Sequence, residues 1–481
     1  MGRHGAAGGA DEPGRGRDAS RPHESRHRDR VRGGRRAALG DLPAGDGRRR
    51  RALRGARALR PGSGPGGTRV SERLVVRNGR HWRTGEPFEL AVEDERIVAS
   101  GGPRAAGEGS RTLDALGAVL APGLVDLHVH LREPGGEGKE TIETGTRAAA
   151  AGGFTAVACM PNTQPVVDNR AWVAWIRERA RAAGHCRVHP IAAVTMGQRG
   201  EQLTEMLALA EAGAAAFSDD GRPVMSAEVM RRALEYARPT GLPIVCHEED
   251  LTLRGQGHMH EGAVSARLGL AGIPAAAEVV MVRRDVELAE LTGGRVHLAH
   301  LSAAGSYDAL RDAKRRGLAV TGETCPHYWT LSDEAVGDYD TCAKMNPPLR
   351  SAADRAAVIE AIRSGVVDCF ATDHAPHTLE DKRQPFDLAP FGIVGLETAL
   401  LWTDAPRRVF GLPEVTLAPG SPADFTLIDP ELEWTVDASR FHSKGRNTPF
   451  EGWTLTGKAL GTWCGGIATH REESWIEASA R

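Results

Sequence analysis

Apolar and polar positions alternate in short runs over residues 73–120, and turn sequences such as Asn-Gly and Gly-Glu-Pro separate the runs. A period of two places successive side chains on opposite faces of a strand, so each run predicts a short β-strand. The same pattern returns near the C-terminus in "SPADFTLIDPELEWTVD" and "WTLTGKALGTW". We therefore predict a small β-sandwich assembled from both chain ends, residues 72–120 and 412–470.

Between these two segments, short apolar strands alternate with helical stretches rich in Ala, Arg and Glu. "FTAVACM", "RVHLAHL" and "VVDCFATD" are three of the strands, and "AWVAWIRERARAAG" is one of the helical stretches. Seven or eight such units in succession are typical of a (β/α)8 barrel. The predicted fold class is α/β, with a (β/α)8 barrel over residues 121–411 next to the β-sandwich.

The first 71 residues have a different composition from the rest of the chain. Residues 1–70 hold 18 arginines, no lysine and seven acidic residues, with almost no aromatic or β-branched residues. Such a segment cannot bury enough apolar surface to offset its chain entropy. We expect residues 1–71 to be a disordered extension. A basic arm that binds RNA or an acidic partner is the weaker alternative, because arginine without lysine suggests GC-rich coding sequence.

The composition of the whole chain excludes several other classes of protein. The net charge is −2, and the seven cysteines form no CxxC pair, which is typical of a reduced cytosolic protein. No apolar run reaches the roughly 18 residues that a membrane span needs, and no apolar core of a secretory signal follows the N-terminus. We expect a cytoplasmic protein without a membrane or nucleic-acid partner.

Polar residues interrupt the apolar strands at particular places. Asp126, His128, His130 and Arg132 are spaced two apart, so they share one face of a strand. An isolated pair of this kind is more often a core histidine with a satisfied hydrogen bond than a metal ligand. Here, however, other predicted strands also end in His or Asp: Asp219, Asp220, His247, His300, Asp373, His374 and His377. Because the strand ends of a barrel meet at one rim, these side chains predict one cluster, and His with carboxylate is the donor set of catalytic zinc.

With these residues in place, the chain resembles the amidohydrolase superfamily and, within it, the bacterial dihydroorotases that lack a carbamylated lysine. The matching motifs are "GLVDLHVHLREPGGEGKETIETG", "MPNTQPVVDN", "FSDDG", "VHLAHLS", "KMNPPLRS", "DCFATDHAPHT" and "PFGIVGLET". They occur in the family's order between about residues 73 and 465. The resemblance implies reversible hydrolysis of L-dihydroorotate to N-carbamoyl-L-aspartate in de novo pyrimidine (UMP) biosynthesis.

The resemblance also implies roles for individual residues. The implied metal ligands are His128, His130, Asp220, His247, His300 and Asp373, which would hold one or two zinc ions, with two favoured. Asp220 would bridge the ions, and Asp219 is the competing choice. Asp373 would also be the catalytic general base. His297 remains a barrel-wall histidine.

A second set of residues would bind the substrate. The implied contacts are His130, Arg132, Asn162, Asn346, His377, Phe391 and Gly392. Arg132 would form a bidentate pair with a substrate carboxylate. This preference for an acidic substrate, together with the absence of a lysine from "FSDDG", disfavours the alternative of an allantoinase or hydantoinase-type cyclic amidase.

The chain departs from the family pattern in two places. It joins "GLETA" to "FGL" in about a dozen residues, at about 400–411, where family members carry one or two helices, so the outer helix of the last βα unit is predicted to be missing. Glu248 stands where a small residue is common. The shortened join keeps open a non-catalytic subunit that scaffolds aspartate carbamoyltransferase. We expect a homo-oligomer, with aspartate carbamoyltransferase as a candidate partner.

Overall fold

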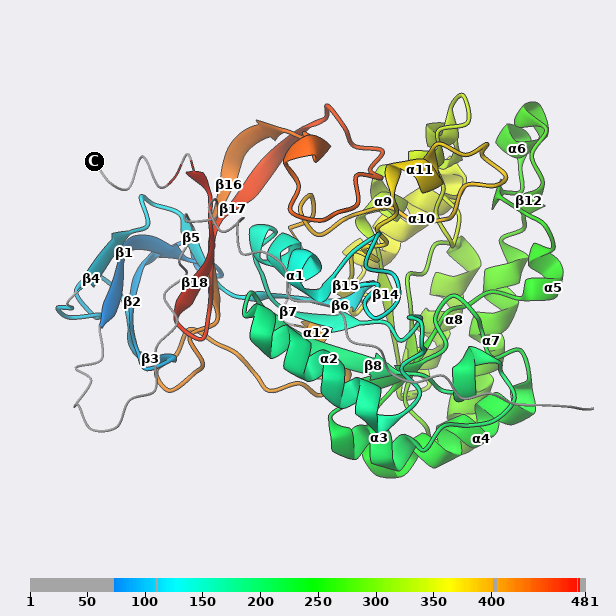
Figure 1. The fold of residues 1–481 in the computed structure, drawn as a ribbon, viewed down its shortest axis with the longest axis horizontal. Coiled ribbons are helices and arrows are strands. Elements are labelled where there is room, and N and C mark those ends of the chain that lie inside the picture. Colours follow the sequence, from blue (N-terminus) through cyan, green and yellow to red (C-terminus); the bar gives the residue numbers. More distant parts are fainter. Residues whose placement is uncertain (1–72, 110, 401–404, 474, 476–481) are drawn as a thin grey trace, which may run out of the picture. The chain divides into compact units, whose positions relative to one another are not determined.

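A computed structural model of the chain describes residues 73–109, 111–400, 405–473 and 475 (Figure 1). The predicted disordered extension, residues 1–71, lies outside the described residues, as do residues 401–404 of the shortened join. The described part contains two eight-stranded sheets and a short two-stranded ribbon. One large sheet is parallel and is interleaved with helices, and the other combines strands from both ends of the chain.

The parallel sheet is the predicted barrel, which the structure confirms. Neighbouring strands are paired in the order β15-β14-β13-β10-β9-β8-β7-β6. A parallel bridge from Val129 to His374, next to a hydrogen bond from the His130 N–H to the His374 carbonyl at 2.9 Å, closes the circle. The strands are β6 (Leu124–Val129), β7 (Phe154–Cys159), β8 (Arg187–Ala192), β9 (Ala216–Ser218), β10 (Ile244–Cys246), β13 (Val296–Leu298), β14 (Val320–Thr324) and β15 (Cys369–Phe370).

A helix of seven residues or more follows each of the first seven barrel strands. Polar side chains cap several of these helices; Asn169, for example, accepts the N–H groups of Ala171 and Trp172. The helices are α1 (Ile142–Ala151), α2 (Arg170–Ala183), α3 (Met206–Ala212), α4 (Ala227–Ala237), α7 (Ala276–Thr292), α8 (Ala304–Arg315) and α10 (Ala352–Arg363). Shorter elements lie in the loops: α5 (Leu251–Arg254), β11 (Met259–His260), α6 (Ala263–Leu268), β12 (Gly272–Ile273) and α9 (Pro326–Thr330).

The last barrel strand is followed by two short helices in the described residues, α11 (Leu379–Lys382) and α12 (Ala405–Phe410). Val409 and Phe410 of α12 are buried and pack in the same cluster as Val125, Ala156 and Val245 of β6, β7 and β10. The Val409 carbonyl accepts a hydrogen bond from Arg295, the residue just before β13, at 2.7 Å. This segment therefore fills the N-terminal end of the barrel, opposite the strand ends that carry the polar residues.

The second sheet unites the two ends of the chain. Its path is β18-β17-β16-β5-β1-β2-β3, with β4 paired to β1, and β16 lies antiparallel to β5 (Figure 1). An isolated antiparallel bridge joins Arg96 of β3 to Pro422, just before β16. Strands from both ends of the chain contribute to one apolar cluster, which includes Leu90, Phe425 and Trp463. The strands are β1 (Leu74–His81), β2 (Pro87–Glu93), β3 (Arg96–Gly101), β4 (Arg111–Asp114), β5 (Val119–Pro122), β16 (Phe425–Thr435), β17 (Thr454–Cys464) and β18 (Ile467–Arg471).

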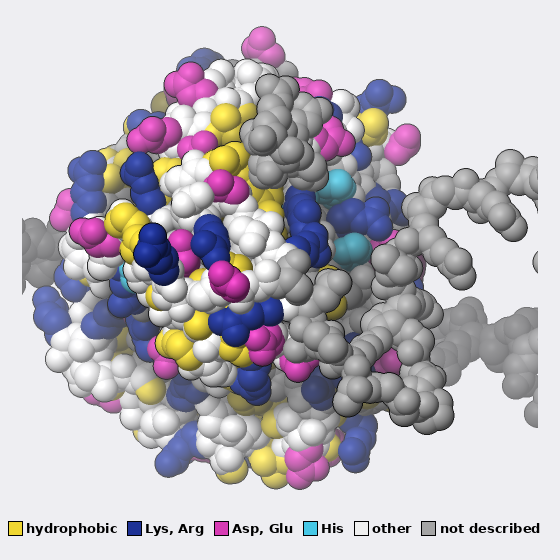
Figure 2. Space-filling model, turned by 90° about the vertical axis from the view of Figure 1, so that its left-hand side faces the viewer, with side chains coloured by type: hydrophobic (Ala, Val, Ile, Leu, Met, Phe, Trp, Pro, Cys, Tyr) yellow, Lys and Arg dark blue, Asp and Glu magenta, His cyan; other side chains and the backbone are white. Residues whose placement is uncertain are grey.

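This β unit presents a mixed surface. Figure 2 shows basic and acidic side chains interspersed with hydrophobic ones over this side of the described residues. Gly123 joins β5 of the β unit to β6 of the barrel, and a Cβ there would lie 2.0 Å from Thr155 Oγ1. The close approach of the two units at this point thus requires glycine. No helix among the described residues is long and apolar enough to cross a membrane.

Candidate metal centre and substrate cavity

The candidate metal ligands lie at the C-terminal ends of five barrel strands. His128 is in β6, and the others lie within three residues of a strand end: Asp220 after β9, His247 after β10, His300 after β13 and Asp373 after β15. All five are buried. Because the strands are parallel and closed into a barrel, their C-terminal ends converge, and residues more than 200 positions apart meet.

Asp220 lies at the centre of this cluster. Its Oδ1 is 3.5 Å from His128 Nε2, from His247 Nδ1 and from His300 Nε2. Its Oδ2 is turned to His130 Nε2, at 3.6 Å. One carboxylate therefore faces four imidazoles with two different oxygens, which is the arrangement that a bridging ligand needs.

Asp373 approaches the cluster from the other side. Its Oδ1 lies 3.1 Å from His130 Nε2 and 3.5 Å from His128 Nε2. The six residues overlap in three groups, each with ligand atoms within 4.8 Å of one another: His128–His130–Asp220, His128–His300–Asp373 and Asp220–His247–His300. The structure thus brings together every residue that the sequence proposed as a metal ligand.

These residues fit a zinc-type ion. Imidazole nitrogens and carboxylate oxygens are the ligands that catalytic zinc takes. His128 Nε2 is buried and has no hydrogen-bond partner, although Asp220 and Asp373 both lie 3.5 Å away. A buried nitrogen without a partner costs free energy, and an ion among these side chains would supply the missing interaction.

The charges of the cluster favour ionised carboxylates. Burial alone would raise the pKa of Asp220, but the charge of His128 and the close contacts with the neighbouring imidazoles hold it well below its usual value. The pKa of Asp373 is lowered in the same way, with burial opposed by His128 and His130. Ionised carboxylates are the form that binds a cation.

The backbone at this rim is strained at three site residues. Arg132, His300 and Asp373 have φ angles of 56°, 37° and 47°, in the left-handed region that residues with a side chain rarely adopt. Each such residue costs on the order of 1–3 kcal/mol. Such strain persists only where the surrounding structure holds it, and all three residues line one cavity at the barrel mouth.

Sequence reasoning missed two carboxylates that hold the candidate ligands in place. Glu323 of β14 accepts from His128 Nδ1 at 3.0 Å and from His297 Nε2 at 3.1 Å. Glu249 lies 3.6 Å from His247 Nε2 and accepts from the Asn346 amide at 3.2 Å. A carboxylate on the outer nitrogen of a ligating histidine sets its orientation. The signal for Glu323 was its place in "TGETC", on the same strand face as Thr321.

The barrel-wall histidine of the sequence analysis lies beside this network. His297 is fully buried and bonds Thr321 Oγ1 through Nδ1 at 2.8 Å and Glu323 through Nε2. Its ring also meets Phe410 edge-on, with the centroids 5.8 Å apart. His297 therefore links the metal candidates to α12 at the opposite end of the barrel.

A cavity of about 310 Å³ opens above the cluster. Besides five of the metal candidates, its lining contains every predicted substrate contact: His130, Arg132, Asn162, Asn346, His377, Phe391 and Gly392. Gly392 has a φ of 147°, and a Cβ there would lie 2.6 Å from the Ala375 carbonyl. The loop can approach the cavity this closely only with glycine.

Arg132 and His377 form the cationic wall of the cavity. Arg132 Nη2 lies 3.3 Å from His377 Nε2, and Arg132 Nε donates to the Pro376 carbonyl at 3.3 Å. Burial, together with the charges of Arg132, Lys139 and Lys382, lowers the pKa of His377 to about 2, so its imidazole is neutral. The wall thus offers one half-buried guanidinium to an anion.

Two asparagines join this wall to the metal candidates. Asn162 Oδ1 lies 2.9 Å from His130 Nδ1, and its amide donates to Asp220 Oδ2 at 3.2 Å. Asn346 lies beside His247, with its Oδ1 buried and unpaired. The cavity also contains Arg254, which sequence reasoning missed; its guanidinium lies 5.5 Å from the centre of the Phe391 ring.

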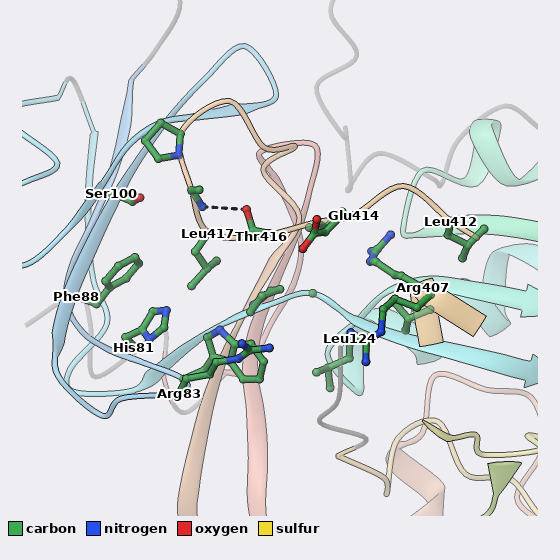
Figure 3. A pocket seen from close by; sticks show the side chains of 18 residues that line it. His81, Arg83, Phe88, Ser100, Leu124, Arg407, Leu412, Glu414, Thr416 and Leu417 are labelled. Carbon is green, nitrogen blue, oxygen red and sulfur yellow. Dashed lines mark hydrogen bonds between the residues drawn. The ribbon is translucent and has the colours of Figure 1, made fainter. Parts of the chain in front are cut away.

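A larger cavity, of about 550 Å³, lies elsewhere, between the β unit and the 407–419 segment. Figure 3 shows His81, Phe88 and Leu417 on one side of it and Leu124 and Arg407 on the other. Its lining contains none of the predicted site residues. The smaller cavity at the barrel mouth is therefore the one that carries the candidate chemistry.

Comparisons with known proteins agree with this geometry. A family model described as Dihydro-orotase-like matches residues 117–306. The dihydroorotase of Pelotomaculum thermopropionicum is 55% identical over 401 residues, which cover 79% of this chain and 93% of that protein. The dihydroorotase of Anaeromyxobacter dehalogenans is 51% identical over 442 residues, which cover 88% of this chain and 98% of that protein.

Solved structures show the same fold at lower sequence identity. The L-hydantoinase of Arthrobacter aurescens superposes with a TM-score of 0.75 at 24% identity, over 83% of this chain and 96% of that one. The dihydropyrimidinase of Brevibacillus agri superposes with a TM-score of 0.70 at 22% identity, over 83% of this chain and 95% of that one. With relatives above 50% identity along most of its length, the chain belongs to the dihydroorotase family.

Proposed function

We propose that this chain is a zinc-dependent dihydroorotase, which interconverts L-dihydroorotate and N-carbamoyl-L-aspartate in pyrimidine biosynthesis. The observation that carries the proposal is a single cavity whose lining contains Arg132 together with five of the six metal candidates. A ring amide placed over the cluster would have its carboxylate at the arginine. The name of the relatives supports this substrate.

Different residues of the cavity would bind the substrate, hold the metal and transfer the proton. Arg132 pairs with the substrate carboxylate, and Asn162 and Asn346 orient the ring by hydrogen bonds, so the ring carbonyl points to the cluster. Zinc held here would act as a Lewis acid and lower the pKa of a bound water. Asp373 accepts the proton of the attacking water and passes it to the leaving ring nitrogen. In the reverse direction the same carboxylate removes a proton from the carbamoyl nitrogen.

We further propose two zinc ions that share Asp220. The support is the division of its oxygens, with Oδ2 toward His130 and Oδ1 toward His247 and His300. His128 lies close to His130 on one side and to His300 on the other. Metal analysis of the purified protein against the dialysis buffer tests the number, and a single equivalent in fully active protein would contradict it.

An activity assay with matched substrates tests the proposed function. Purified protein with zinc is given dihydroorotate, N-carbamoyl-aspartate, hydantoin and allantoin, with Asp373→Asn as the inactive control. We expect turnover of the first two only, and loss of it in the variant. Turnover of hydantoin or allantoin alone would support the cyclic-amidase alternative. A zinc-loaded protein without any turnover would support the non-catalytic subunit.

The same proposal extends to assembly and location. We propose a barrel over residues 121–411 that acts in the cytoplasm as a homo-oligomer, with aspartate carbamoyltransferase as a candidate partner. Seven unpaired cysteines, five of them buried, are in keeping with a reducing compartment. Light scattering of the pure protein, alone and with the transferase, tests the assembly, and a monomer in both samples would contradict it.

A further inference from the structure

A second cluster of potential ligands lies behind the candidate metal centre, between β10 and α7. In the extended backbone around His247, the residues on either side face away from the barrel interior. Cys246 and Glu248 therefore meet α7, whose inner face carries Asp285. The Cys246 thiol and one carboxylate oxygen each from Glu248 and Asp285 lie within 4.8 Å of one another, and all three residues are buried.

Glu248 has no hydrogen-bond partner in this position. It is 1% exposed, and neither of its carboxylate oxygens has a hydrogen-bond partner. Glu278, on the same helix α7 and also 1% exposed, shows how the fold normally satisfies such a group: it accepts from the N–H groups of Ser302 and Ala303, from Ser306 and from Arg350. An unpaired buried carboxylate costs several kcal/mol unless a cation or a proton joins it.

The neighbouring arginine does not supply that cation. Arg284 uses Nε and Nη2 for the two oxygens of Asp285, at 2.7 and 3.0 Å. Its Nη1 donates to the carbonyls of Val224 and Met225, at 2.9 and 3.1 Å. The guanidinium is therefore fully engaged by Asp285 and the two carbonyls, and Glu248 is left without a hydrogen bond in a closed space.

We propose that Cys246, Glu248 and Asp285 bind a divalent transition-metal ion of the zinc type, separate from the ions of the barrel mouth. A thiolate among the ligands selects such an ion over magnesium or calcium. A cavity of about 10 Å³ adjoins two of the three side chains, Cys246 and Asp285, and is close to the space of one water, which would complete four ligands. The site ties β10 to α7 directly behind His247, and its role is structural.

Cobalt substitution tests the proposal without reference to enzymatic activity. The candidate ligands of the barrel mouth include no thiol, so a thiolate-to-Co²⁺ charge-transfer band reports on a site outside the barrel mouth, and cysteine variants assign it. We expect the band in the wild-type protein and its loss in Cys246→Ser, together with the loss of one equivalent of bound metal. Cys369→Ser is the matched control, because Cys369 is also buried near a histidine and a carboxylate, His297 and Glu323, and it should retain the band.

Two results would overturn the proposal. A wild-type protein that is loaded with cobalt but lacks the band has no thiolate ligand, and Glu248 then holds a proton instead. A band that survives Cys246→Ser and disappears in Cys369→Ser assigns the thiolate to the other site. If Cys246→Ser does not fold, the nearly isosteric Glu248→Gln decides: we expect it to lower the bound metal by one equivalent, and unchanged metal with an unchanged band contradicts the site.

Discussion

Asp219 and Asp220 are adjacent in the chain, but their carboxylates serve opposite sides of the end of β9. Asp220 Oδ1 lies 3.5 Å from three imidazoles of the candidate metal centre. Asp219 Oδ1 instead accepts the N–H groups of Val194 and Thr195, at 2.9 and 3.1 Å, and its Oδ2 accepts the Thr195 hydroxyl. Asp219 thus ties β9 to the end of β8, and Asp220 faces the cluster.

This division leads to opposite expectations for the two alanine variants. Asp220→Ala should lose most of the bound zinc, because it removes the group that faces four imidazoles. Asp219→Ala should keep the zinc but lower the free energy of unfolding by about 1–3 kcal/mol, since buried donors lose their acceptor. Metal analysis and denaturant titration of both variants check this. The reverse order of zinc loss would mean that Asp219 is the ligand.

Arg132→Met should lower kcat/KM for dihydroorotate by roughly a hundredfold or more and leave the bound zinc unchanged. The loss of a charge-assisted pair in a buried site costs on the order of 3 kcal/mol, or roughly a hundredfold in kcat/KM. Steady-state kinetics and metal analysis measure the two effects. Arg181→Met on α2, whose side chain is 69% exposed, is the control. Near-normal kcat/KM in Arg132→Met would remove the argument for an acidic substrate.

Phe410→Ala should destabilise the protein although it lies far from the candidate chemistry along the barrel axis. Phe410 is 2% exposed and packs on residues of the barrel strands and on the His297 ring. Truncating a buried phenylalanine costs about 3–5 kcal/mol. Denaturant unfolding measures it, with the 62% exposed Leu291→Ala as control. A loss equal to that of the control would show that α12 does not support the barrel.

Glu397 should make stability depend on pH between about 5 and 7. Burial raises the pKa of Glu397 to about 7 from its ordinary 4.5, against hydrogen bonds from the N–H groups of His442 and Ser443. Between these values the folded state holds a proton that the unfolded state has released. The free energy of unfolding therefore falls as pH rises through this window, by on the order of 2–3 kcal/mol.

Glu397→Gln removes the titrating group and should flatten that dependence. Denaturant titrations from pH 5 to pH 8 compare the variant with the wild type and with the exposed Glu201→Gln. If the wild type and Glu397→Gln fall in parallel, another group causes the change in stability.

The sequence by itself determined the barrel and the main set of candidate ligands, for local reasons. The period of two places His128 and His130 on one strand face, and βα alternation predicts a barrel whose strand ends converge. The structure confirms the barrel and brings the six candidates together. The two β segments were also recognisable as strands from their alternation alone.

Only the tertiary structure decided contacts between side chains that local pattern cannot pair. Glu323 meets His128 across 195 positions of sequence, and α12 reaches His297 by folding under the barrel. Strand periodicity says that Asp219 and Asp220 face opposite ways, but not which of them faces the histidines. Likewise, Glu248 is only a small departure from the family pattern in the sequence, and the structure shows that it lies close to Asp285 of α7. Such pairings depend on how the barrel closes and how each helix is rotated against it, and the packing of the whole core sets both.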